Sequence, residues 1–278
     1  MTEIPLDEAE QIFTKSFDGL AIIGGFANHV SMVLSGTPTD IQGELASMVH
    51  AKMCAHARSI GAVAQSSMFD HSAIMALARM MIEGMTMSSY IRELVSAEEW
   101  ELRYAVLSLH DTVARIKLFR AWKEKAEYAD LRIGRDALLQ GIRTNSVFLE
   151  LGVDVQERLL RGEDLFVGGM RKAAMRAGWN EDSFTALYGY LSTHVHSAPM
   201  SFFRARVQQI DYYRPGQAQH AAASMAIEIA SACHRRVTLL QLDDHLRKFP
   251  DDERHFHAEL VQEVRNDDTK CSIFKRGG

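Results

Sequence analysis

Apolar residues recur along most of the chain at intervals of three and four positions, the spacing of an amphipathic α-helix. One such series is Ile74, Leu77, Ala78, Met81, Ile82 and Met85, and another is Val106, Leu109, Val113, Ile116 and Phe119. The strict apolar–polar alternation of half-buried strands is absent from the sequence. The pattern therefore predicts an all-α fold without a sheet.

The positions of the prolines and glycines predict where the helices begin and end. A proline inside a helix costs about 3 kcal/mol, and the proline-free stretch 39–198 therefore permits long helices. The expected helices run from about Leu6 to Leu34, Asp40 to Ala64, Asp70 to Val95, Ala97 to Lys125, Tyr128 to Leu151, Asn180 to Val195, Gln217 to Arg247 and Asp252 to Val264. Asp40 and Asn180 are expected to be N-caps.

The remaining segments are read as short helices, turns and a tail. Gly162, Gly168, Gly169 and Gly178 break up the stretch between the fifth and sixth of these helices, and residues 197–199 (Ser-Ala-Pro) are expected to form a turn. The simplest organisation is a single multi-helix bundle, residues 1–265, followed by a flexible polar tail, residues 266–278.

Composition narrows the class of protein. Charged residues make up 24% of the 278 residues and apolar ones 47%, which excludes a disordered or low-complexity chain. The formal charge of −5 gives no global basic field that would attract nucleic acid or anionic lipid, although a local patch remains possible. Three cysteines without a Cys-x-x-Cys pair argue against a disulfide framework and against a thiolate zinc site. Residues 1–10 hold four acidic residues and no basic one, unlike a secretory signal, so a cytoplasmic location is expected.

An uncharged stretch, Gly19 to Thr39, is 21 residues long, about the length of a membrane-spanning helix. It also contains Gly24, Gly25, Asn28, His29, Ser31, Ser35 and Pro38, too much polar and flexible content for favourable insertion. We therefore expect no membrane span here but a helix buried on most of its circumference.

Arg79 and Glu83 interrupt an otherwise apolar helix face. They lie four residues apart and therefore share one side of the helix. Buried charges are costly unless they are paired, so the two residues are expected to form an internal salt bridge or to face a common pocket.

A second polar stripe lies near the end of a later helix. Tyr188, Ser192 and His196 follow one another at four-residue spacing, and fraying of the helix end could bring His194 to the same rim. We expect this stripe and the Arg79–Glu83 pair to meet in one polar cluster, because each is a polar interruption in need of partners. The cluster could equally be a structural network, with a histidine that caps the helix end.

The Arg-x-x-x-Glu helix, the Tyr-x-x-x-Ser-x-x-x-His helix and the Ser-Ala-Pro turn together resemble an uncharacterised family of all-helical bacterial proteins. The resemblance covers about Asp70 to Ser201. It implies an all-α fold and a polar pocket built from Arg79, Glu83, Tyr188, Ser192 and His196, and it implies no known reaction.

The helix content and a histidine near a helix end also resemble the helical HEPN-type nucleotide-binding and ribonuclease domains. Those domains carry an arginine followed, after four to six residues, by a histidine. Chance alone predicts about three such matches in a chain of this composition, and the sequence holds two, Arg103 to His110 and Arg214 to His220. The motif is therefore uninformative, and a solvated helix face explains Arg103 and His110 equally well.

Other catalytic scaffolds are missing from the sequence. It has no Gly-x-Gly-x-x-Gly, P-loop or Gly-x-Ser-x-Gly motif, and no Glu-x-x-His pair of the kind that di-iron bundles require. Metal ligation is conceivable at three loose groups: His50, Cys54 and His56; His194 and His196; or His255 and His257. Such groups arise readily by chance among twelve histidines, and we expect neither a metal nor another cofactor.

Two functional hypotheses follow. In the first, a pocket of Arg79, Glu83, Tyr188, Ser192, His194 and His196 binds the phosphate of a nucleotide or RNA. Arg79 would neutralise the anion and His196 would act as general acid or base, as in a metal-independent nuclease. In the second, the same residues form a structural network, and the protein acts by helix association, as a homo-oligomer or with a partner, through its uncharged first helix.

Overall fold

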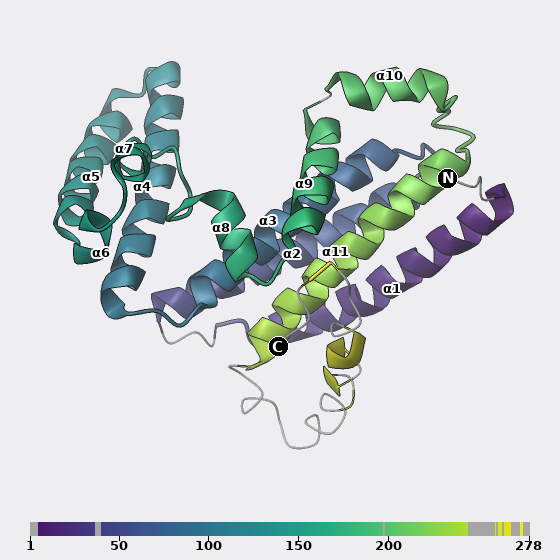
Figure 1. Cartoon of the computed structure of the whole chain (residues 1–278), viewed down its shortest axis with the longest axis horizontal. Helices are drawn as coiled ribbons and strands as arrows, with labels where there is room; N and C mark the ends of the chain where they lie inside the picture. The colour runs from purple at the N-terminus through teal and green to yellow at the C-terminus, as the bar shows by residue number, and fades with distance from the viewer. Residues whose placement is uncertain are drawn as a thin grey trace. The chain divides into compact units, whose positions relative to one another are not determined.

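The structure is a computed structural model that describes residues 5–36, 40–196, 198–243, 259, 261–262, 264–267 and 273–274. These residues are helical or lie in connecting turns, apart from one isolated bridge between Trp179 and Phe274 (Figure 1). The predicted all-α fold is confirmed for the described part of the chain.

The helices named below carry the labels of Figure 1. They are α1 (Leu6–Val33), α2 (Ile41–Ala64), α3 (His71–Arg92), α4 (Ala97–Trp122), α5 (Lys125–Thr144), α6 (Ser146–Leu149), α7 (Val153–Leu160), α8 (Gly169–Arg176), α9 (Glu181–Val195), α10 (Pro199–Val207) and α11 (Gln217–Asp243).

These helices form two compact units. Residues 1–92 and 177–278 make the first, and residues 93–176 make the second. The expectation of a single domain over residues 1–265 stays a prediction. Within the predicted tail, Phe274 is buried and its ring lies 5.0 Å from that of Trp179.

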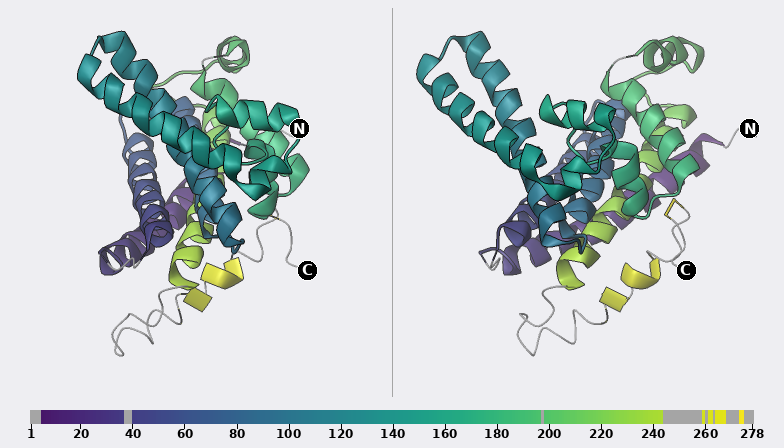
Figure 2. Two further views of the ribbon diagram at one scale, coloured as in Figure 1. Left: turned by 90° about the vertical axis from the view of Figure 1, so that its left-hand side faces the viewer. Right: turned by 60° about the vertical axis from the view of Figure 1, so that its left-hand side comes forward.

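The first unit is assembled around α11. This helix packs against α3, α1 and α2, and α9 packs on α3 (Figures 1 and 2). Because α11 is covered on several sides, small and apolar residues are buried around most of its circumference, among them Ala223, Ile227, Ala230, Cys233, Val237 and Leu242. The polar residues that α11 places inside the unit are consequently enclosed by protein.

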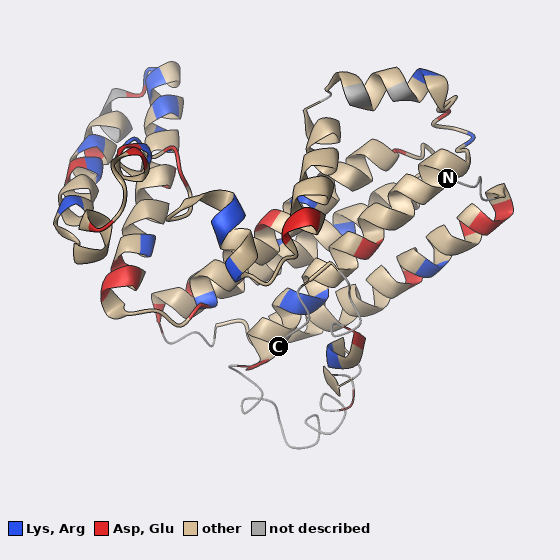
Figure 3. Cartoon of the chain, viewed as in Figure 1, with Lys and Arg blue, Asp and Glu red and all other residues tan. Residues whose placement is uncertain are grey.

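The uncharged segment of α1 is buried or partly buried at most of its positions, as the sequence predicts. Leu20, Ile23 and Val30 face the core, whereas the side chains of Ile22 and Met32 are 68% and 69% exposed. The exposed positions form one stripe, the outer side of α1, and α1 carries no charge after Asp18 (Figure 3).

Capping signals were read correctly at two helix starts. The Asp40 carboxylate accepts a hydrogen bond from the backbone N–H of Gly43, and the Asn180 side chain accepts one from Ser183. Most of the final helix expected between Asp252 and Val264 lies outside the described residues, as do His255 and His257.

Two local expectations were wrong. The helix expected from Tyr128 to Leu151 is interrupted at Asn145, whose side chain caps α6 by accepting from the Phe148 N–H. Of the turn expected at residues 197–199, residue 197 lies outside the described residues, and Pro199 is instead the first residue of α10. Proline is well tolerated in the first position of a helix, because its missing N–H has no intrahelical role there.

The second unit has a core of its own between α4 and the helices that follow it. That core contains Leu102, Val106, Leu109, Ile142, Phe148 and Leu159. Arg103 on α4 is fully buried and forms ion pairs with Glu93 at 2.8 Å and with Glu99 at 2.5 Å. Arg176 joins the same two carboxylates. The solvated face expected for Arg103 is therefore wrong, because these carboxylates compensate its charge inside the protein.

Gly162 ends α7 in a conformation that favours glycine. Its φ is +65°. The Gly162 N–H donates to the carbonyl of Leu159, and the Glu163 N–H donates to the carbonyl of Arg158. These two hydrogen bonds form a Schellman motif. A Cβ at this position would lie 2.8 Å from Cγ2 of Val113. Gly162 is therefore required by both the backbone and the packing.

Substituting Gly162→Ala should lower the free energy of unfolding by about 1 to 3 kcal/mol, the cost of a strained left-handed residue. Gly134→Ala is the matched control, because Gly134 lies inside α5 with open space around its Cα. The control should raise stability by about 0.5 to 1 kcal/mol. Urea unfolding of both variants measures the difference, and equal shifts would contradict this description of the turn.

Candidate functional site

The predicted polar cluster lies where α9 packs on α3. Arg79 Nη2 on α3 donates to the Tyr188 hydroxyl on α9 at 2.9 Å, and that hydroxyl donates to Glu83 Oε1, also at 2.9 Å. Arg79 and Glu83 form a salt bridge of 3.0 Å. The Arg79 guanidinium also lies over the Tyr188 ring, 4.8 Å from its centroid. The expected meeting of the two polar groups is confirmed for these three residues.

His196 completes this cluster at the end of α9. Its Nε2 lies 3.4 Å from Arg79 Nη1. The arrangement is open to solvent, since His196 is exposed and the Glu83 side chain is 42% exposed, whereas the Arg79 side chain is only 16% exposed. Such exposure fits a binding site better than a sealed structural network.

The remaining two predicted residues have different neighbours. The Ser192 hydroxyl donates to the backbone carbonyl of Tyr188 within α9. His194 Nδ1 lies 3.2 Å from the Ser72 hydroxyl, and its ring is 6.0 Å from that of His71. His194 therefore belongs to a second polar group at the start of α3, which the sequence did not indicate.

The surroundings of the Tyr188 hydroxyl keep it in its neutral, protonated form. Burial raises the pKa of Tyr188 above its usual value, the hydrogen bond from Arg79 opposes this rise, and Glu83 reinforces it. A protonated Tyr188 accepts from Arg79 and donates to Glu83 at once. It thereby fixes the direction in which the guanidinium points.

Burial also lowers the pKa of His71 and His194 below the ordinary 6.5, while the Asp70 carboxylate opposes the shift in both. As the pH falls, the unfolded chain takes up these protons before the folded one does. The free energy of unfolding should therefore fall as the pH drops below 6.5.

The His71→Phe variant isolates this contribution, because phenylalanine keeps the ring contacts and removes the proton site. Urea unfolding between pH 7 and pH 5 should give a shallower decline for the variant than for the unmodified chain. Identical slopes would contradict the assignment of this pH dependence to His71.

A third polar group is buried between α2 and α11. His50 and Cys54 on α2, which the sequence grouped with His56, are joined in the structure by His234 on α11. Burial lowers the pKa of His50 to about 4 and that of His234 to about 3, and it raises the pKa of Cys54 to about 11. Sequence spacing gave no sign of His234, because 180 residues separate it from Cys54.

No protein-family model, curated protein or solved structure matches this chain. Among the described helices, none combines the length and the hydropathy that crossing a membrane requires. Function is therefore inferred from side-chain geometry.

Proposed function

We propose that the chain binds an anionic ligand, the phosphate of a nucleotide or of RNA, between Arg79 and His196. The observation that carries this proposal is the 3.4 Å approach of Arg79 Nη1 to His196 Nε2 in an exposed position. Arg79 Nη1 donates there, and His196 Nε2 accepts or donates according to its tautomer. When Nε2 carries a hydrogen, an anion placed between them can accept from both nitrogens.

The other side of the guanidinium is already fixed. Nη2 is held by Tyr188 and Glu83, which leaves Nη1 on the side of His196. This arrangement reduces the entropy lost when a ligand is bound, because the arginine needs no reorientation. Glu83 also sets a limit on affinity, since its negative charge partly neutralises Arg79.

With RNA as the ligand, the site is suited to metal-independent cleavage. The 2′-hydroxyl oxygen would attack phosphorus and form the O2′–P bond, while the P–O5′ bond breaks. His196 would accept the 2′ proton, a water molecule would protonate the leaving O5′, and the resulting hydroxide would take the proton from His196, while Arg79 would stabilise the charge on the phosphoryl oxygens. Tyr188 acts as a positioning residue because it orients Arg79.

Calorimetric titration with adenosine 5′-monophosphate and with a short single-stranded RNA tests the proposal. Binding to the unmodified chain should weaken at least tenfold in His196→Ala and in Arg79→Gln. The control is His56→Ala, which removes a partly exposed histidine of α2 outside the cluster. Absence of binding to the unmodified chain, or equal affinity in all the variants, would refute the proposal.

The second candidate function is self-association through the outer side of α1. Ile22 and Met32 are the exposed apolar residues of the uncharged segment, and Gly25 and His29 lie between them within the width of one helical stripe. A second copy of the chain presents the same uncharged surface, so two such stripes can cover each other.

Non-denaturing mass spectrometry tests for self-association through α1. A dimer should appear for the unmodified chain and dissociate in Ile22→Lys and Met32→Lys. It should persist in Ile133→Lys, which places the same charge on an equally exposed residue of α5. A monomer at micromolar concentration, or a dimer that survives both α1 substitutions, would refute this candidate.

A further inference from the structure

We propose that His50, Cys54 and His234 form a zinc-binding site inside the first unit. The three side chains come from two helices that pack against each other, α2 and α11. One candidate ligand atom from each residue lies within 4.8 Å of the other two. Two imidazoles and one thiol are a donor set that Zn²⁺ commonly takes.

The distances match tetrahedral coordination. Cys54 Sγ lies 3.5 Å from His234 Nε2 and 4.0 Å from His50 Nε2. With a Zn–S bond of about 2.3 Å and a Zn–N bond of about 2.05 Å, a tetrahedral angle separates sulfur from nitrogen by about 3.6 Å. Both sulfur–nitrogen distances therefore lie within a few tenths of an ångström of the separation in a tetrahedral zinc site.

The local helix geometry holds the donors in place. His50 and Cys54 are four residues apart on α2 and therefore share one face, and His234 faces them from the buried side of α11. The three residues are 1%, 2% and 0% exposed, so packing restricts their rotamers.

Hydrogen bonding accounts for only part of this group. The Thr238 hydroxyl lies 3.3 Å from His50 Nε2 and donates to the carbonyl of His234, so it can also accept from His50. Cys54 Sγ lies 3.5 Å from His234 Nε2, a hydrogen-bond distance for sulfur, and 4.0 Å from His50 Nε2, at the limit of that range. His234 Nδ1 has no hydrogen-bond partner in the described part of the chain. The imidazole of His234 is thus directed at Cys54, and its other ring nitrogen is buried without a partner.

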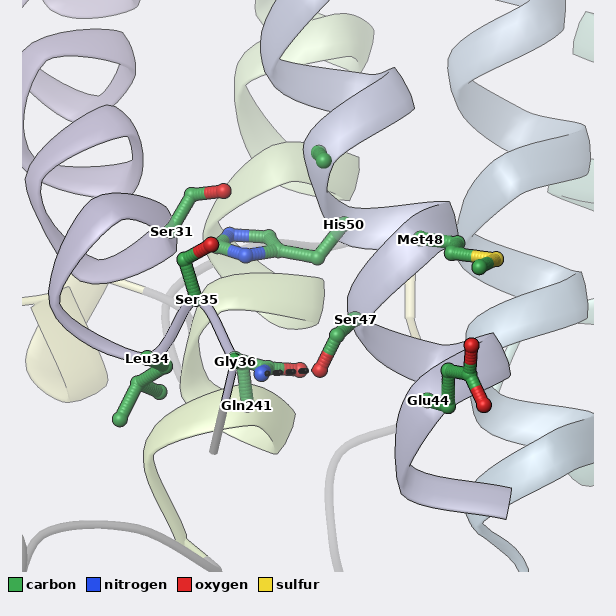
Figure 4. Close-up of a pocket in the computed structure, with 10 residues that line it drawn as sticks. Ser31, Leu34, Ser35, Gly36, Glu44, Ser47, Met48, His50 and Gln241 are labelled. Carbon is green, nitrogen blue, oxygen red and sulfur yellow. Dashed lines mark hydrogen bonds between the residues drawn. The ribbon is translucent and has the colours of Figure 1, made fainter. Parts of the chain in front are cut away.

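A cavity of about 430 Å³ borders the group on the side of His50. Its lining includes Ser31, Ser35, Ser47 and Gln241, and Figure 4 shows the His50 ring among these residues. Gln241 donates to the Ser47 hydroxyl at 3.1 Å. The polar lining can hold water, and a water molecule can supply the fourth ligand that three protein ligands leave open.

The binding of one Zn²⁺ ion releases one proton. The thiol of Cys54 gives its proton to solvent and becomes the thiolate ligand, and the two imidazoles bind in their neutral form. Uptake therefore requires no oxidant, reductant or second ligand.

Titration of the full, metal-stripped chain with Co²⁺ and with Zn²⁺ tests the site. One equivalent of Co²⁺ should give the absorption bands of a tetrahedral thiolate complex, one equivalent of Zn²⁺ should abolish them, and native mass spectrometry should show one zinc ion per chain. The Cys54→Ser and His234→Gln variants should lose the thiolate band or bind at least a hundredfold more weakly.

Cys233→Ser is the matched control, because it makes the same change at a neighbouring buried thiol of α11. It should bind like the unmodified chain, and circular dichroism should show that the variants stay helical. Failure of the unmodified chain to bind Co²⁺, or a thiolate band that persists in Cys54→Ser, would overturn the proposal even if one variant did not fold.

Discussion

Replacing Arg103 with alanine should lower the free energy of unfolding by about 3 kcal/mol at neutral pH. The side chain is fully buried, and its removal leaves Glu93 and Glu99 with Arg176 in place of the two cations that they share. The estimate lies at the low end for broken buried ion pairs, because both carboxylates are partly exposed and Arg176 still contacts them. Chemical unfolding measured by circular dichroism gives the value.

Arg161→Ala is the control for this prediction. Arg161 forms its ion pairs with Glu157 and Glu163 at the surface, where its side chain is 51% exposed. Its substitution should leave the free energy of unfolding nearly unchanged, because exposed ion pairs are hydrated and screened. If Arg103→Ala were no more destabilising than this control, Arg103 would not hold the second unit together.

The Arg79→Ala and His196→Ala variants should both lose phosphate binding but should differ in stability. His196 is exposed at the end of α9, so its removal should change the free energy of unfolding by less than about 0.5 kcal/mol. Arg79→Ala removes the contacts with Tyr188 and Glu83 and should cost about 1 kcal/mol.

The sequence alone suggested a larger cost for Arg79→Ala, because Glu83 was expected to be stranded on an apolar face. With 42% of its side chain exposed and the Tyr188 hydroxyl still donating to it, Glu83 is instead partly hydrated. Thermal unfolding beside the binding assay measures both effects. Equal destabilisation by the two variants, with no loss of binding, would favour the structural-network hypothesis.

The sequence predicted the helices well where periodicity and capping agree. The start of α2 at Asp40 and that of α9 at Asn180 follow from side chains that accept from the first free N–H groups. The start of α10 could not be predicted in this way, because Pro199 suits the first turn of a helix as well as it suits a turn.

Contacts within the site were predictable where local spacing, or a polar side chain on an apolar face, indicated them. The pairing of Arg79 with Glu83 follows from four-residue spacing, and their need for partners pointed to Tyr188. The contact between Ser72 and His194, and the approach of His234 to Cys54, depend on how distant helices pack. Spacing along one helix contains no information about such packing.

The same limit explains why the solvated position considered for Arg103 was wrong. A charged residue on an amphipathic helix is usually solvated, and α4 alone gives no indication that Glu93 and Arg176 enclose this one. Contacts with residues outside α4 therefore bury Arg103, although its position on the helix suggests a solvated side chain.

The central claim is that a phosphate group binds between Arg79 and His196, and side-chain NMR tests it most directly. Adenosine 5′-monophosphate would be titrated into chain labelled with ¹⁵N in arginine and histidine side chains. The claim predicts saturable shifts of the Arg79 Nε–H and His196 imidazole resonances, with those of Arg161 and His56 unchanged. Unchanged Arg79 and His196 resonances, or saturable shifts confined to other residues, would contradict it.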